Sequence, residues 1–83
     1  MNVTEEVKTL LGRVLGIEHR ARHFEASTAL FGAIAELDSR AVITLIAALE
    51  EKFDIVVADD EITAEVFETL GSLTKFIERK LAA

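Results

Sequence analysis

The segment from Ser39 to Phe53, "SRAVITLIAALEEKF", constrains the fold more than any other part of the chain, because its apolar spacing is helical. Apolar side chains recur at i, i+3, i+4, i+7 and i+11, at Val42, Leu45, Ile46, Leu49 and Phe53. Asp38 or Ser39 can cap its start, where a carboxylate also suits the positive end of the helix dipole. The segment therefore predicts a helix of about four turns with one buried face.

Two further stretches have the same periodicity, one near each end of the chain. The first runs from a cap at Asn2 or Thr4 to Gly16, a glycine that can end a helix. The last follows Ser72 as its predicted cap. Between them, residues 62–71 predict a short helix that Gly71 ends, and the sequence has no proline to break any of these segments.

Residues 17–38 have no long apolar stripe, although scattered apolar side chains indicate that they pack against the core. The prediction is therefore an all-α fold in which residues 1–83 form a single domain. It is a small helical bundle with three main helices, one short helix, and a long structured loop between the first and second main helices.

The net charge of −6 lies entirely in residues 36–83, because acidic and basic side chains balance in residues 1–35. Such a field repels nucleic acid and attracts basic protein surfaces. The longest apolar run, Ala41 to Leu49, is far shorter than the ~20 residues of a membrane span. Two glutamates near the N-terminus are unlike a signal peptide. We therefore expect a cytoplasmic monomer without a membrane span or a nucleic-acid partner.

The residue types for catalysis or metal binding are scarce. His19 and His23 are four apart, as in zinc pairs, but the sequence has no cysteine and no third histidine to complete a site. Ser39 has no histidine near it in sequence that could act as its base. The acidic runs at residues 50–51 and 59–61 lack the spacing of a calcium loop. We predict no metal site and no enzymatic activity.

On these grounds alone, Ser39 is a helix cap. Its setting suggests a second role, because an apolar loop leads through Leu37-Asp38-Ser39 directly into an amphipathic helix. The segment "LDSRAVITLIAALEEKFDIVVADDEI" resembles the acyl carrier proteins in its Asp-Ser pair, its aliphatic stripe, its "ALEEKFDI" ending and the acidic turn that follows. The resemblance extends over about residues 30–81.

The resemblance implies that Ser39 receives a phosphopantetheine arm from coenzyme A, added by a separate phosphopantetheinyl transferase that Asp38 helps to contact. The chain would then be a phosphoprotein of fatty acid or lipid biosynthesis that carries acyl groups as thioesters. Acyl-loading and acyl-transfer enzymes would dock on residues of the acidic helix face: Glu36, Arg40, Glu50, Glu51 and Asp54. The acyl chain would be lined by the aliphatic residues Ile46, Leu49, Val57, Ile62, Val66 and Leu70.

Two positions depart from the family pattern. Arg40 stands where an aliphatic residue is usual, and Thr44 where an acid is common. Both imply a dedicated set of partners. The sequence "LFGAIAELDS…DDEITAEVFETLGSL" is most similar to stand-alone carriers of exosortase and exopolysaccharide systems. Two alternatives stay open: an acidic helical adaptor without a cofactor, in which Ser39 is only a cap, and a carrier of aminoacyl groups.

Overall fold

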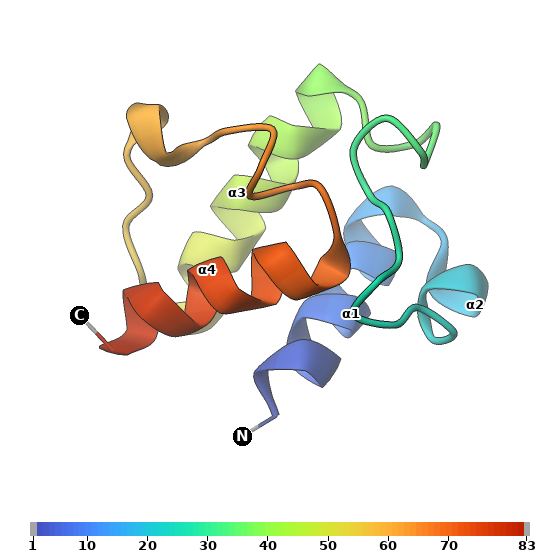
Figure 1. The fold of residues 1–83 in the computed structure, drawn as a ribbon, viewed down its shortest axis with the longest axis horizontal. Coiled ribbons are helices and arrows are strands. Elements are labelled where there is room, and N and C mark those ends of the chain that lie inside the picture. Colours follow the sequence, from blue (N-terminus) through green and yellow to red (C-terminus); the bar gives the residue numbers. More distant parts are fainter. Residues whose placement is uncertain (1, 83) are drawn as a thin grey trace.

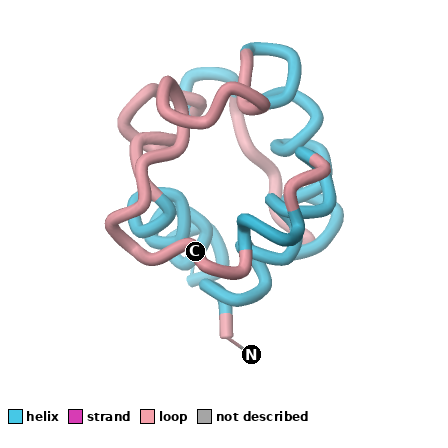
Figure 2. Tube along the Cα trace, turned by 90° about the vertical axis from the view of Figure 1, so that its right-hand side faces the viewer, coloured by secondary structure: helices cyan, strands magenta, loops and turns pink. Residues whose placement is uncertain are grey.

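The computed structural model describes residues 2–82, which contain three long helices and two short ones (Figure 1). The long helices are α1 (Val3–Leu15), α3 (Ser39–Phe53) and α4 (Leu70–Ala82). The short ones are α2 (Glu18–Ala21) and the 3₁₀ helix η1 (Asp59–Glu61). Figure 2 shows helices and loops only within this part of the chain. The prediction of an all-α bundle is confirmed.

Local sequence explains how α1 begins and ends. The Asn2 side chain accepts a hydrogen bond from the Glu5 backbone N–H at 3.1 Å, which satisfies one of the free donors of the first turn. At the other end, Gly16 has a φ of 69°, a left-handed conformation that glycine adopts without steric cost. Both residues have the roles that the sequence predicted.

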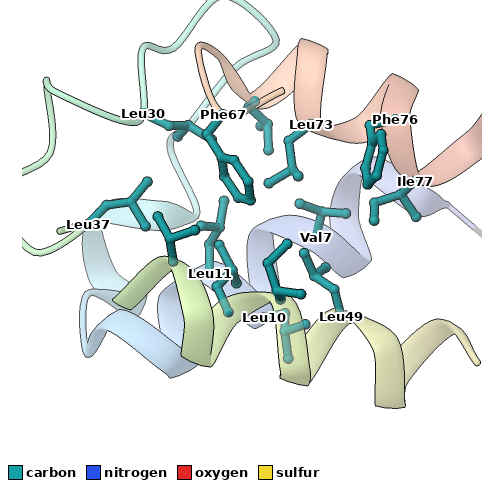
Figure 3. Packing of buried hydrophobic residues seen from close by; sticks show 14 of the residues in the cluster. Val7, Leu10, Leu11, Leu30, Leu37, Leu49, Phe67, Leu73, Phe76 and Ile77 are labelled. Atoms are coloured by element: carbon teal, nitrogen blue, oxygen red, sulfur yellow. The ribbon is translucent and has the colours of Figure 1, made fainter. Parts of the chain in front are cut away.

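The core lies where α1 packs against the other helices. Helix α1 contacts α2, α3 and α4, so it is the element that the bundle shares. Figure 3 shows Val7 and Leu11 from α1 facing Leu49 of α3 and Ile77 of α4. The loops complete this core with other buried side chains, namely Leu30, Ile34, Leu37, Val57 and Phe67. The long loop thus packs against the core, as its apolar residues indicated.

The short helix predicted at residues 62–71 is wrong. Residues 62–69 are not helical: turns cover residues 64–67, and Thr69 forms an isolated bridge with Ala29. Helix α4 begins at Leu70, before the predicted cap at Ser72. Thr69 and Ser72 instead bond reciprocally, each side-chain oxygen accepting the other residue's backbone N–H at 3.0 Å. The two short helices lie elsewhere: α2 is within the segment that the sequence predicted as loop, and η1 ends at Glu61.

Main-chain bonding between two distant segments accounts for this difference. The N–H groups of Leu30 and Phe31 donate to the carbonyls of Glu68 and Phe67, both at 2.9 Å. In the opposite direction, the N–H groups of residues 70 and 71 donate to the carbonyls of residues 28 and 26. We call these four hydrogen bonds the loop–loop seam; Figure 1 shows the green loop beside the orange segment that precedes α4. Backbone groups satisfied in this way do not need a helix.

Gly12 allows α2 to pack closely on α1, and we expect Gly12→Ala to destabilise the fold. A Cβ atom there would lie 2.9 Å from the Glu18 Cα and 3.2 Å from the Ala21 Cβ. In an open helix the same change would stabilise by about 1 kcal/mol. Here we expect a net loss of roughly 1–3 kcal/mol from overpacking, measured by urea unfolding followed by circular dichroism. Thr44→Ala, on the exposed face of α3, is the control and should not lower stability. A Gly12→Ala protein as stable as the wild type would contradict the close contact.

None of the helices in residues 2–82 has the length and apolar character needed to cross a bilayer.

Candidate functional site

Ser39 is the first residue of α3, and it is exposed. The cap of this helix is Asp38, whose backbone is extended and whose Oδ1 accepts a hydrogen bond from the Ala41 N–H at 2.9 Å. Within residues 2–82 the Ser39 hydroxyl makes no hydrogen bond to another residue. The sequence allowed either Asp38 or Ser39 to be the cap. The cap is Asp38, so the Ser39 hydroxyl is free to react.

The position of Ser39 also suits a negatively charged substituent. The first backbone N–H groups of an α-helix lack acceptors within the helix, and they form the positive end of its dipole. Phosphate groups bind favourably at such an end. A phosphate ester on the Ser39 hydroxyl would lie beside the first turn of the 15-residue helix α3. The residues present thus fit a phosphate-linked group.

The loop before Ser39 is held by apolar and charged contacts. Leu37 is buried, and Glu36 Oε2 forms an ion pair with Arg20 Nη1 of α2 at 2.8 Å. A hydrogen bond from its own backbone and the bond from Arg20 lower the pKa of Glu36. These contacts fix the chain just before the Asp38 cap, so the direction in which α3 begins is determined by α2 and the core.

An apolar groove of about 280 Å³ opens beside Ser39. It lies between the long loop, the first turns of α3 and the segment that follows η1. Its walls are formed by Phe31, Ser39, Val42, Ile43, Ile62, Thr63, Ala64 and Phe67. Only Ser39 and Thr63 contribute hydroxyl groups, so the groove suits an apolar chain linked to Ser39.

Of the six predicted lining residues, only Ile62 borders this groove. Four others are buried in the core, and Val66 is half-buried against it: the four are Ile46, Leu49, Val57 and Leu70. Sequence reasoning missed Phe31, Val42, Ile43 and Phe67. Helical spacing could have found two of them, because positions three and four after Ser39 share its helix face.

The residues predicted for partner docking have different environments. Glu36 is paired with Arg20, and Glu50 is half-buried, with its Oε2 accepting a bond from the Val57 N–H at 2.8 Å. Glu51 and Asp54 are exposed near the end of α3, and Arg40 is exposed next to Ser39. Two of the four predicted acids are thus occupied by contacts within the chain.

The two histidines lie next to each other at the surface. The rings of His19 and His23 meet edge to face with centroids 6.2 Å apart, and both residues are exposed. Within residues 2–82 no group of three or more histidine, cysteine or acidic side chains is placed to hold a metal ion.

Glu61 links η1 to α4, and this contact makes stability depend on pH. Its Oε1 accepts bonds from the Ala58 N–H and from Lys80 Nζ, both at 2.9 Å. The Ala58 bond and then the Lys80 bond lower the pKa of Glu61 below the ordinary 4.5. A lowered folded-state pKa gives stability that is present above pH 4.5 and is lost as the pH falls through the lowered value.

We therefore expect Glu61→Gln to reduce the loss of stability on acidification. The measurement is a set of urea unfolding curves from neutral pH to below pH 4.5. The control is Glu65→Gln, which removes an exposed carboxylate with no ion pair in the described chain. Parallel acid profiles for wild type and Glu61→Gln would contradict the proposed linkage.

Comparisons with known proteins agree with this geometry. A family model described as a phosphopantetheine attachment site matches residues 5–77. This defines the class of the domain: a carrier to which phosphopantetheine is covalently attached. The solution structure of a holo acyl carrier protein from Nitrosomonas europaea superposes with a TM-score of 0.92 at 52% identity, and the match covers 100% of both chains. The chain belongs to the acyl carrier protein family.

A curated acyl carrier protein from Sulfurovum sp. (strain NBC37-1) is 54% identical over 41 residues. That match covers 49% of this chain and spans about half, 52%, of the relative.

Proposed function

We propose that the chain carries acyl groups as thioesters on a phosphopantetheine arm attached to the Ser39 hydroxyl. The observation that supports this most directly is the division of roles at the start of α3. Asp38 caps the helix, whereas Ser39 stays exposed beside an apolar groove. A serine needed only as a cap would hold the helix end itself.

The attachment reaction needs a partner enzyme. The Ser39 oxygen would attack the phosphorus that bears the pantetheine part of coenzyme A. The new O–P bond forms, the P–O bond of the diphosphate bridge breaks, adenosine 3′,5′-bisphosphate leaves, and the serine proton passes to a base of the transferase. This chain supplies the hydroxyl and a helix end that favours the added negative charge.

When attached, the arm supplies the thiol that the chain lacks, since the sequence contains no cysteine. The groove at Ser39 would shelter the first part of an apolar cargo against Val42 and Phe67. In this function the chain is a non-catalytic substrate of the transferase and of acyl-loading and acyl-transfer enzymes. A role in lipid or exopolysaccharide synthesis, a monomeric state and a cytoplasmic location remain predictions from the sequence.

Intact mass spectrometry tests this proposal. The purified protein is incubated with coenzyme A, magnesium and a broad-specificity phosphopantetheinyl transferase, beside Ser39→Ala. We expect one added phosphopantetheine in the wild type and none in the variant. Loading of the modified protein with acyl or aminoacyl groups by the loading enzymes of the same genome would then identify the cargo. No added mass with several transferases would favour the adaptor without a cofactor.

A further inference from the structure

The surface around Ser39 is apolar and carries an exposed cation. Ile43 is 70% exposed and Phe31 is 45% exposed, although both are large hydrophobic residues. They border the groove together with Ser39, and the exposed Arg40 follows Ser39 directly. We call Phe31, Arg40 and Ile43 the Arg40 patch. Arg40 forms no ion pair with any residue in the described part of the chain.

The carboxylates of α3 and of the loop just before it do not offset this cation in the way that the net charge suggests. Glu36 is paired with Arg20, and the Asp38 carboxylate accepts the Ala41 N–H of the first turn. The free carboxylate of Glu51 lies 12 residues along α3 from Ser39, or about 18 Å at 1.5 Å per residue. The screening length at physiological salt is about 8 Å. A protein that approaches Ser39 therefore encounters Arg40 more strongly than the acids at the far end of the helix.

The Ser39 hydroxyl itself determines which partner must cover this patch. An enzyme that forms a bond to the Ser39 oxygen has to bring its active site onto the first turn of α3. Side chains four apart on a helix have Cβ atoms about 5–6 Å apart, so this enzyme also covers Ile43. Arg40, the next residue on the same turn, then lies at the edge of this contact. A charge at the rim of an interface favours a partner of opposite charge and disfavours one of like charge.

We propose that the Arg40 patch is the docking surface for the phosphopantetheinyl transferase, and that a carboxylate of the transferase pairs with Arg40. This inference rests on the proposed function. Ile43 and Phe31 supply the apolar contact area, and Arg40 supplies selectivity. A transferase with a basic surface at this point is disfavoured, because it would place a like charge against Arg40. Arg40 is thus a specificity-determining residue for the attachment reaction.

The test uses the purified chain, coenzyme A and the transferase encoded in the same genome, with Arg40→Glu, Arg40→Leu and Ile43→Ser. Arg13→Glu, on the exposed side of α1, changes the net charge by the same amount and is the matched control. Circular dichroism and urea unfolding verify that each variant is folded. We expect Arg40→Glu to lower kcat/KM roughly tenfold or more, mainly through KM, because a rim charge acts on encounter. Arg40→Leu and Ile43→Ser should lower it less, and Arg13→Glu should leave it within about twofold.

Added salt provides a second readout. The difference between wild type and Arg40→Glu should shrink as salt rises, because screening weakens both the attraction and the repulsion. An unchanged or higher kcat/KM for Arg40→Glu would overturn the inference. So would a dimer that is seen by light scattering and lost in Arg40→Glu while transferase kinetics stay the same, because the patch would then bind a second copy. If the wild type gains no arm at all, the proposed function itself fails, so the two failures are distinguishable.

Discussion

Ser39→Ala is expected to abolish phosphopantetheine attachment while leaving the fold almost as stable as in the wild type. The two effects separate because the Asp38 carboxylate, not the Ser39 hydroxyl, bonds the Ala41 N–H. Removing an exposed hydroxyl without a partner at the start of α3 should change stability by less than about 0.5 kcal/mol. Attachment should fall below detection, since no other serine opens an exposed helix end beside the groove in the described chain. Intact mass and urea unfolding measure the two effects.

Asp38→Ala provides the complementary result. It leaves the Ser39 hydroxyl in place and removes the cap, so stability should fall by about 1 kcal/mol. Ser27→Ala, at an exposed position of the long loop, is the control for losing a serine and should retain both stability and attachment. If Ser39→Ala lost the stability expected of a missing cap and Asp38→Ala did not, the assignment of roles at this helix end would be wrong.

The largest loss of stability is expected from Phe67→Ala. Phe67 is 2% exposed, belongs to the core and also borders the groove, and its carbonyl accepts a bond of the loop–loop seam. Truncating a buried phenylalanine costs about 3–5 kcal/mol, because apolar burial is lost and a cavity is left. That cost is a large fraction of the stability of a chain this small. Thermal and urea unfolding should both show the change.

Phe31→Ala is the matched control, because it removes the same kind of side chain from another residue that borders the groove. Phe31 is 45% exposed, and its backbone N–H, not its ring, takes part in the seam. We expect it to cost less than about 1 kcal/mol. Similar losses for the two variants would show that the Phe67 side chain is not part of the core as described.

The three long helices were predictable because their patterns are local. Caps such as Asn2, a glycine at position 16 and apolar residues three and four apart specify these helices without reference to the rest of the chain. Residues 62–71 carry a similar apolar spacing, yet they are not helical before Leu70. The competing bonds come from residues 26–31, about 40 positions earlier in the sequence, and a local pattern does not contain them.

The candidate site also has features that the sequence predicts and features that only the fold shows. Ser39 and Asp38 could be found from sequence because they are adjacent and open a strongly periodic helix. The groove could not, because its walls come from three separate segments that only the fold brings together. Most of the residues predicted to line the acyl chain, such as Leu49, are buried in the core and do not border this groove. Sequence alone also could not show that Glu36 and Glu50 are held by Arg20 and by the Val57 N–H.

The loop–loop seam has a consequence for how the cargo preference of such a domain can change over time. Its four hydrogen bonds join main-chain atoms, so they are indifferent to side-chain identity at most of the positions they connect. Phe31 and Thr63 can therefore be exchanged for larger or smaller residues while the backbone around Ser39 keeps its place. The width and polarity of the groove can therefore change while the backbone around it stays the same. In the proposed function, single substitutions would thus adapt the groove to new cargo without rebuilding the start of α3.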